Sequence, residues 1–244
     1  MPFASINGLQ LHYELHGSEG DPLVFVHGFT GDITDWRLQV PEFSPEHRVL
    51  VLDNRGNGRS DAPQDRAAYT VDNIAHDAER LVEHVGFERY HLVGHSMGGA
   101  VAQEIALRSP ARLLSLTLQD TTCWAGDHGD GRGTPPYIPP ELVAEGVKRV
   151  ARMTPDALAG AWNGWISWRG TIDRAHAIST PTLILYGDRD ASKIIEGSQR
   201  LQELIPHAET IVIPGAGHSP QLERPELFNE ALRRHLASVS ATRR

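Results

Sequence analysis

A serine flanked by glycines is the pattern in this chain with the clearest chemical meaning. The segment Gly94-His95-Ser96-Met97-Gly98 lies between a short apolar stretch, residues 91–93, and a helical stretch, residues 100–107. A strand, a sharp turn and a helix in this order are typical of a nucleophile elbow, whose strained turn holds the serine hydroxyl away from the sheet. The same pattern also occurs in ordinary loops, so partners elsewhere in the chain must support this interpretation of Ser96.

A serine hydroxyl becomes a good nucleophile only when a base takes its proton and a third group orients that base. With this kind of elbow the chain order is serine, acid, histidine. Asp190 follows an apolar stretch at residues 183–186, and His218 follows another at residues 210–213. Both come at the carboxyl ends of predicted strands, as Ser96 does. We therefore predict that Asp190 is the acid and His218 the base.

Other residues compete for these two roles. Asp188 lies in the same loop as Asp190, and Asp120 ends a predicted strand at residues 113–118, so either is an alternative acid. His27 and His95 also lie near the predicted site. Because both adjoin sharp turns, we expect them to hold those loops rather than to accept protons.

The negative oxygen of a tetrahedral intermediate needs hydrogen-bond donors. The Met97 N–H, directly after the predicted nucleophile, supplies one of them. The loop at residues 27–32 follows an apolar stretch and is expected to supply the second. We choose the Phe29 N–H, because Gly28 lets the backbone approach the reacting carbonyl. The alternative is that His27 and Gly28 form only a turn.

Strands and helices alternate along most of the chain. Residues 1–15 have the pattern of a hairpin around Asn7-Gly8, and Thr70 is predicted to cap a helix that Gly86 ends. Continuous apolar stretches are typical of parallel strands covered on both faces. Further strands are expected at residues 23–26, 49–52, 91–93, 113–118, 183–186 and 210–213, and further helices at residues 100–107, 141–152, 155–168, 194–204 and 226–236. The alternation predicts an α/β fold with a mostly parallel sheet of about eight strands and helices on both faces.

Residues 121–180 interrupt this alternation. Residues 127–140 are rich in glycine, proline and charge and are expected to form a loop before two helices. Because sites of open α/β sheets lie at the carboxyl ends of strands, an insertion at this point is expected to roof the site. We therefore divide the chain into a core, residues 1–120 and 181–244, and a helical cap, residues 121–180.

Trp162, Trp165 and Trp168 of this cap are spaced by three, which on a helix places them close to one face. One interpretation is that they pack the cap onto the core. The other is that they form an aromatic wall for an apolar substrate, with Trp124 at the cap entrance beside them. On the second interpretation, Trp124, Trp162 and Trp165 contact the substrate.

The composition disfavours several functions. The chain has 244 residues, 40% of them hydrophobic, and a formal net charge of −8, which disfavours a nucleic-acid partner. A single cysteine, Cys123, excludes an intrachain disulfide and a cysteine-rich metal site. The N-terminus resembles a strand rather than a signal peptide, and no apolar stretch approaches the roughly 20 residues that span a bilayer. We expect a cytoplasmic monomer or homodimer with no membrane partner, no metal and no cofactor.

These motifs resemble the α/β-hydrolase fold superfamily, and the similarity covers essentially the whole chain outside the insertion. In that family the aspartate of Gly-x-x-Asp is the catalytic acid, which supports Asp190. Serine at position 96 argues against the haloalkane dehalogenase and epoxide hydrolase branches, which have an aspartate there. Within the family the chain looks like the capped esterases, enol-lactonases and C–C hydrolases. Besides the elbow, the motifs are His27-Gly28-Phe29 followed by Trp36, Asp53-Asn54-Arg55-Gly56-Asn57-Gly58-Arg59-Ser60, residues 181–190, and Gly215-Ala216-Gly217-His218.

We therefore expect a carboxylic ester hydrolase that acts on a small apolar ester through an acyl-enzyme on Ser96. A second hypothesis keeps the same three residues but cleaves a C–C bond or an enol lactone, whose carboxylate or enolate would be held by cap arginines: Arg132, Arg169 and Arg174. A third hypothesis is a ligand receptor with slow or vestigial hydrolysis.

Overall fold

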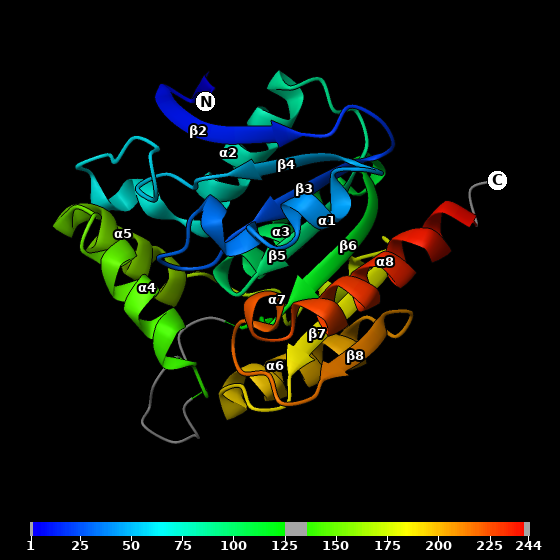
Figure 1. The fold of residues 1–244 in the computed structure, drawn as a ribbon. Helices are drawn as coiled ribbons and strands as arrows, with labels where there is room; N and C mark the ends of the chain where they lie inside the picture. Colours follow the sequence, from blue (N-terminus) through cyan, green and yellow to red (C-terminus); the bar gives the residue numbers. More distant parts are fainter. Residues whose placement is uncertain (1, 125–135, 242–244) are drawn as a thin grey trace.

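Eight strands form one sheet in the computed structural model, which describes residues 2–124 and 136–241 (Figure 1). Their order across the sheet is β1-β2-β4-β3-β5-β6-β7-β8. β2 pairs antiparallel with β1 and β4, and the other neighbours pair in parallel. The predicted α/β class and mostly parallel sheet are thus confirmed. The strands are β1 (Phe3–Ile6), β2 (Leu9–His16), β3 (Pro22–Val26), β4 (Arg48–Leu52), β5 (Tyr90–His95), β6 (Leu113–Gln119), β7 (Thr182–Gly187) and β8 (Glu209–Ile213).

Helices cover both faces of this sheet, as the apolar strands predict. Val24 and Val26 of β3 belong to one core, which α2 (Val71–His84), α3 (Met97–Arg108) and α6 (Ser192–Leu204) share. Leu23 and Phe25 alternate to the other face, where they pack with α1 (Val40–Phe43) and α8 (Pro225–Ala241). The sheet is thus packed on both faces, and the loops that follow β5, β7 and β8 leave from the same edge of it.

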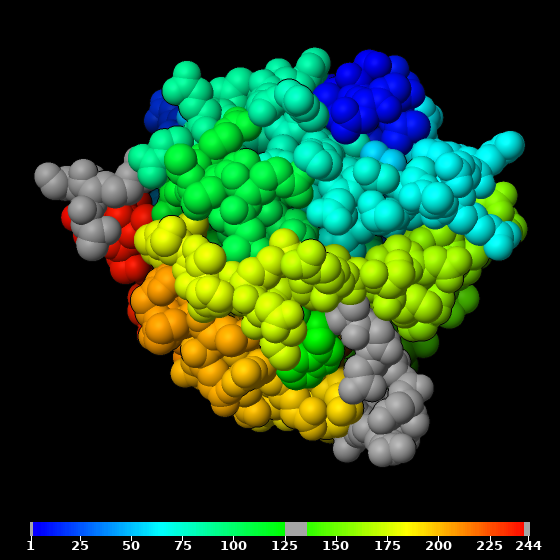
Figure 2. Space-filling model, turned by 180° about the vertical axis from the view of Figure 1, so that it is seen from behind, coloured from blue at the N-terminus to red at the C-terminus, as the bar shows by residue number. Residues whose placement is uncertain are grey.

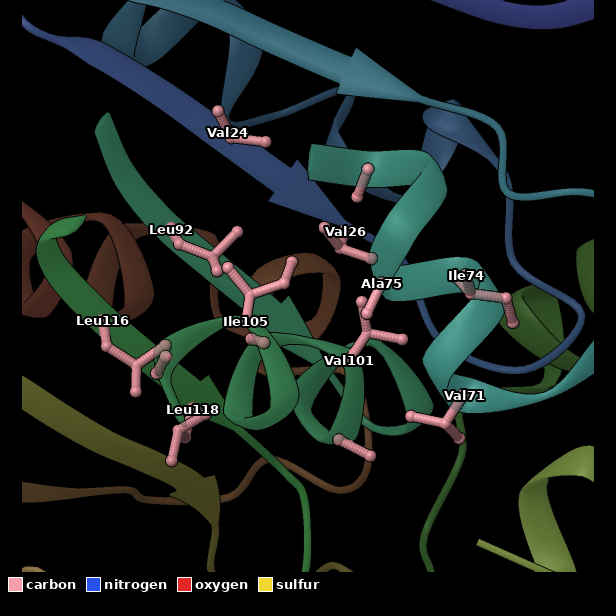
Figure 3. Packing of buried hydrophobic residues seen from close by; sticks show 14 of the residues in the cluster. Val24, Val26, Val71, Ile74, Ala75, Leu92, Val101, Ile105, Leu116 and Leu118 are labelled. Carbon is pink, nitrogen blue, oxygen red and sulfur yellow. The ribbon is translucent and has the colours of Figure 1, made fainter. Parts of the chain in front are cut away.

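The larger core shows why α2 and α3 form where the sequence predicts them. The Thr70 hydroxyl accepts a hydrogen bond from the Asn73 N–H over 3.1 Å, which caps α2, and Gly86 follows the helix with a φ of +76°. Apolar residues of both helices point toward each other and toward the sheet (Figure 3). They include Val71, Ile74, Ala75, Val101 and Ile105, packed over Val26, Leu92, Leu116 and Leu118.

Two helices, α4 (Pro140–Val150) and α5 (Pro155–Ile166), lie in the chain between β6 and β7. α5 packs against the short 3₁₀ helix η2 (Arg66–Tyr69), where the Tyr69 side chain contacts Gly160 so closely that a Cβ there would lie 2.5 Å from its ring. In Figure 1 both helices stand at one side of the sheet. In Figure 2 the lime to yellow segment after α4 crosses the rear face between the green surface and the orange surface.

Some details were not predicted correctly. The second inserted helix ends at Ile166, not at residue 168, so Trp168 lies beyond it. Several short helices have too few residues for a periodic pattern: α1, η1 (Ile33–Trp36), η2, η3 (Pro110–Arg112), η4 (Ala175–Ala177) and α7 (Pro220–Glu223). The predicted loop at residues 127–140 falls largely outside the described residues. Within the described ranges, no helix combines the length and apolarity needed to cross a membrane.

Candidate active site

Ser96 occupies a strained turn between the end of β5 and the start of α3. Its backbone has a φ of +54° and a ψ of −119°, which costs a residue other than glycine roughly 1–3 kcal/mol. A Cβ on Gly94 would collide with the carbonyl oxygen of Gly98, and one on Gly98 with that of Val26. The glycines predicted for the elbow are therefore needed to close the turn. The Thr121 hydroxyl also supports it by donating to the Ser96 carbonyl oxygen over 2.8 Å.

The loops after β7 and β8 bring Asp190 and His218 to this serine. His218 Nε2 lies 3.0 Å from Ser96 Oγ, and His218 Nδ1 lies 2.8 Å from Asp190 Oδ2. Because a carboxylate oxygen accepts, the proton of the imidazole is on Nδ1, and Nε2 is left to accept the proton of the serine hydroxyl. The three residues predicted from the sequence thus form a continuous hydrogen-bonded series.

Charge and burial act in opposite directions on the pKa values of His218 and Asp190. Burial alone would lower the pKa of His218, but the charge and hydrogen bond of Asp190 outweigh it and raise that pKa above its ordinary value of 6.5. Burial alone would raise the pKa of Asp190, yet the opposite charge of His218 and the hydrogen bonds to the carboxylate lower it. The pair therefore favours an ionised Asp190 beside an imidazole that readily accepts a proton.

The two alternative acids make other contacts. Asp188 accepts a hydrogen bond from the Gly215 N–H over 2.7 Å and so joins the acid loop to the base loop. Asp120 is fully buried, and its Oδ1 accepts from the Gly187 N–H over 2.9 Å. Ligating atoms of Asp120, Asp190 and His218 lie within 4.8 Å of one another, and the hydrogen bond between His218 Nδ1 and Asp190 Oδ2 uses one atom of each of the last two residues.

His27 and His95 hold the loops around the serine, as expected. The His27 Nδ1–H donates to the Gly28 carbonyl over 2.8 Å, while its Nε2 accepts from the Asn54 N–H over 3.0 Å. His95 Nε2 lies 2.7 Å from the carbonyl oxygen of His218. Burial and the nearby charge of His218 lower the pKa of His95 to about 3, so His95 stays neutral at any ordinary pH.

The loop after β3 passes directly over the nucleophile. A Cβ on Gly28 would lie 3.0 Å from the Ser96 Cβ, so a side chain at this position would crowd the serine. This contact brings the backbone of Phe29 to the same end of α3 as Met97. Met97 directly follows the serine, and Phe29 directly follows the glycine that contacts it, so the two predicted oxyanion donors stay a prediction that this packing supports.

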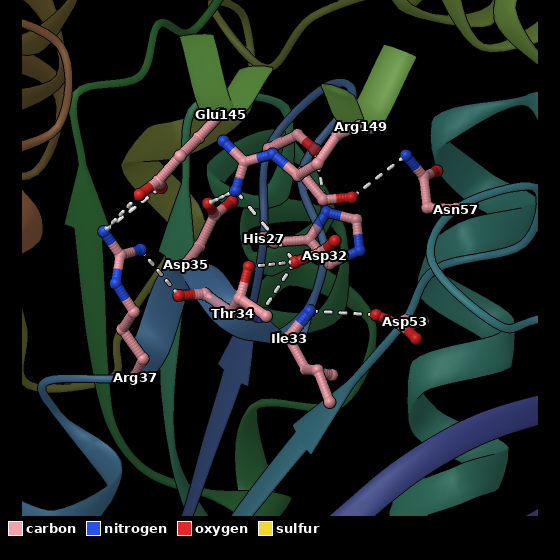
Figure 4. A network of polar contacts seen from close by, with 12 residues as sticks. His27, Asp32, Ile33, Thr34, Asp35, Arg37, Asp53, Asn57, Glu145 and Arg149 are labelled. Atoms are coloured by element: carbon pink, nitrogen blue, oxygen red, sulfur yellow. Dashed lines mark hydrogen bonds and ion pairs between the residues drawn. The ribbon is translucent and has the colours of Figure 1, made fainter. Parts of the chain in front are cut away.

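A charged network fixes the next part of this loop (Figure 4). Arg149 of α4 forms an ion pair with Asp35, whose side chain is only 6% exposed. Arg37 and Glu145 form a second, exposed pair between the same two segments, with 3.1 Å between the charged atoms. Burial raises the pKa of Asp35, and the charge of Arg149 opposes this. The network ties the inserted helix α4 to η1, close to the loop that carries Phe29.

The predicted aromatic contacts fall into two groups. Trp165 and Trp168 stack with ring centroids 5.7 Å apart and are buried in the larger core. Trp162 is 42% exposed, and its ring centroid lies 5.6 Å from that of Phe29. Trp124 is half-buried against the larger core, as is Phe29. Trp162 therefore lies against Phe29, whereas Trp165 and Trp168 pack in the core.

The cap arginines of the second hypothesis differ in their availability. Arg174 donates to Glu104 Oε2 over 2.9 Å and to the Gly170 carbonyl over 2.9 Å, so its charge is already neutralised. Arg169 is exposed. Arg132 lies outside the described residues.

Sequence reasoning missed the support of the base loop by Glu223. Its carboxylate accepts from the N–H groups of Gly217 and Ser219, both over 2.8 Å, and so fixes the backbone on either side of His218. The dipeptide Ser219-Pro220 is a helix-start signal that could have located α7 and with it this carboxylate. The ion pair of Arg149 and Asp35, between residues remote in the chain, has no comparable signal.

A model of the family described as "alpha/beta hydrolase fold" matches residues 21–145 and 145–225. A curated relative, carrying the name carbamate hydrolase RutD, comes from Variovorax paradoxus (strain S110). It is 31% identical over 263 residues, which cover 96% of this chain and 98% of the relative.

Solved structures of two hydrolases are also similar to this chain. A thermophilic esterase from Thermogutta terrifontis is 29% identical, with a TM-score of 0.87 and 98% of each chain covered. The enol-lactonase from Burkholderia xenovorans LB400 is 25% identical, with a TM-score of 0.83, covering 97% of this chain and 100% of that one. These relatives share the overall architecture but carry different reaction names.

Proposed function

The chain belongs to the alpha/beta hydrolase fold family, and on this premise we propose that it is a serine hydrolase that cleaves a carboxylic ester of a small apolar substrate. The proposed nucleophile, base and acid are Ser96, His218 and Asp190. One observation carries the proposal: the unbroken series from Ser96 Oγ to His218 Nε2 at 3.0 Å and from His218 Nδ1 to Asp190 Oδ2 at 2.8 Å.

In the proposed reaction, Ser96 Oγ attacks the ester carbonyl while His218 Nε2 takes the hydroxyl proton. The imidazolium that forms is stabilised by the ionised Asp190, and the Phe29 and Met97 N–H groups hold the oxyanion. His218 then gives its proton to the departing alcohol, which leaves an acyl-enzyme on Ser96. A water molecule that His218 deprotonates attacks this ester and releases the acid, with no cofactor in any step.

The apolar substrate is supported by the rings near the serine loop. We propose that residues 121–180 form a cap and that Trp124 and Trp162 contribute to an apolar wall for the acyl group. Trp165, which was also predicted to contact the substrate, is buried in the core against Trp168. The contact between Trp162 and Phe29 joins this cap to the proposed oxyanion loop. Among the cap arginines in the described residues, Arg174 is already paired with Glu104, which disfavours it as a partner for a charged acyl group.

A second candidate is hydrolysis of a carbamate or an enol lactone, which the names of two relatives favour. Both substrates present a carbonyl carbon to the nucleophile, so the same three residues can act on them. The candidates differ in the group that leaves. A panel of a short p-nitrophenyl ester, an aryl carbamate, an enol lactone and a vinylogous diketone acid ranks them by kcat/KM.

The test of the proposed function is turnover of a short p-nitrophenyl ester by the wild-type protein and by Ser96→Ala. We expect loss of activity by at least about 10³-fold with an unchanged melting temperature. Ser240→Ala is the matched control, because Ser240 in α8 donates to the Leu236 carbonyl and lies outside the proposed site. Full activity in Ser96→Ala would show that another group performs the reaction.

A further inference from the structure

Two carboxyl groups are buried together behind the proposed base. Asp120 is 0% exposed and Asp190 is 4% exposed. Their carboxylate oxygens and a ring nitrogen of His218 lie within 4.8 Å of one another. Two carboxylates that share a dry site repel each other strongly, so such a pair normally keeps one proton. Either Asp120 or Asp190 therefore holds this proton.

The hydrogen bonds assign that proton. Asp190 accepts the His218 Nδ1–H on one oxygen and the Ala191 N–H, over 2.6 Å, on the other. Asp120 Oδ1 accepts the Gly187 N–H, but Asp120 Oδ2 is buried without a hydrogen-bond partner. An ionised carboxylate with a bare buried oxygen is costly, whereas a protonated one can donate from that oxygen to its neighbour.

The backbone holds Asp120 in this place. Its N–H donates to the Leu185 carbonyl over 2.9 Å, and its φ of +44° turns the chain sharply at the end of β6. A left-handed backbone is tolerated by aspartate better than by most residues. The side chain is thereby aimed from β6 across to β7, at the base of the loop that carries Asp190.

We infer that Asp120 is a positioning residue that stays protonated at neutral pH and donates a hydrogen bond to Asp190, so that Asp190 remains the ionised partner of His218. This inference rests on the proposed function. It assigns Asp120 no contact with substrate, and it gives Asp190 a third donor besides His218 and Ala191.

The surrounding charges agree with this assignment. Burial and the charge of Asp190 raise the pKa of Asp120 well above its ordinary value, against smaller opposing effects of the Gly187 N–H and the Gln119 side chain. The other charged or titratable groups that act on His218 are two carboxylates and a neutral histidine: Glu223, Asp35 and His95. Because Asp120 and His218 have atoms within 4.8 Å of each other, a full negative charge at Asp120 would raise the pKa of His218 further.

The variant Asp120→Asn distinguishes a neutral Asp120 in the wild-type protein from an ionised one. An amide has the same shape, accepts from Gly187 and still donates to Asp190, but it carries no charge. If Asp120 is already neutral, Asp120→Asn leaves the acid-side midpoint of the kcat/KM–pH profile where the wild-type protein has it, and kcat falls by less than about tenfold. Asp120→Ala removes the donor, and kcat falls on the order of 10- to 100-fold.

Infrared difference spectroscopy supplies a readout that needs no turnover. At pH 7 the spectrum of the wild-type protein minus that of Asp120→Asn should contain the carbonyl band of one protonated carboxyl group. The inference is overturned if that band is absent, or if Asp120→Asn moves the acid-side midpoint to lower pH, because either result means that Asp120 is ionised. A band without esterase activity would instead refute the proposed function and leave the protonated Asp120 in place.

Discussion

His95 donates a hydrogen bond from Nε2 to the carbonyl oxygen of His218 over 2.7 Å, which joins the residue before the nucleophile to the backbone of the base. Because a carbonyl oxygen can only accept, the proton of the neutral His95 ring must be on Nε2. The pKa of His95, lowered to about 3, keeps the ring neutral at ordinary pH. His218 is thus held near Ser96 by two bonds: one from its ring to the serine, and one from His95 to its backbone carbonyl.

The first prediction concerns this bond. His95→Phe keeps a ring but has no donor, and we expect kcat to fall by about 5- to 10-fold, since one neutral hydrogen bond contributes about 1 kcal/mol. His95→Gln retains an N–H donor and should recover most of that loss. Equal losses in the two variants would mean that the ring shape matters and the bond does not.

The second prediction is a pH dependence. His218 acts as a base only when it is neutral, and Asp190 raises its pKa, so kcat/KM should fall as the pH drops through a midpoint above 6.5. Asp190→Asn removes the negative charge and should lower that midpoint while reducing kcat. Asp72→Asn, which removes an exposed carboxylate on α2, is the matched control and should leave the midpoint unmoved.

The third prediction concerns the glycines of the elbow. A Cβ at Gly98 would collide with the carbonyl oxygens of Val26 and His27, which are backbone atoms that cannot move aside. We expect Gly98→Ala to destabilise the fold by several kcal/mol, beyond the about 1–3 kcal/mol typical of overpacking. Gly146→Ala in α4 meets no atom within 4 Å and should be neutral or stabilise by about 0.5–1 kcal/mol. Urea denaturation of both variants tests this contrast.

The fourth prediction compares the two ion pairs between α4 and η1 (Figure 4). Arg149→Met leaves Asp35 buried without its cation and should cost about 1–3 kcal/mol of unfolding free energy, less than a fully buried pair because Arg149 is 18% exposed. Arg37→Met breaks an exposed pair and should cost less than about 1 kcal/mol. Similar losses in the two variants would show that burial of Asp35 is unimportant.

Some parts of the fold and of the site could be predicted from the sequence, and others could not. The strands, the main helices and the Ser96 turn were predictable, because apolar periodicity and glycine spacing are local properties. The positions of Asp190 and His218 followed from one topological rule, that parallel strands end on the same edge of a sheet.

Other contacts depend on distances that no local pattern contains. Asp120 was weighed only as an alternative acid, since nothing in the sequence shows that its carboxyl group is buried behind Asp190. The bond from His95 to His218 joins residues 123 positions apart, and it requires the exact orientation of both loops. The buried stacking of Trp165 and Trp168 likewise depends on where α5 ends, which periodicity does not fix to within two residues.

The most direct test of the central claim is covalent labelling with a fluorophosphonate, followed by intact mass and peptide mapping. We expect one adduct per chain, located on Ser96, formed quickly by the wild-type protein, slowly by His218→Ala and not at all by Ser96→Ala. An adduct on a different residue, or ester hydrolysis by a protein that the reagent leaves unlabelled, would contradict the assignment of Ser96 as the nucleophile.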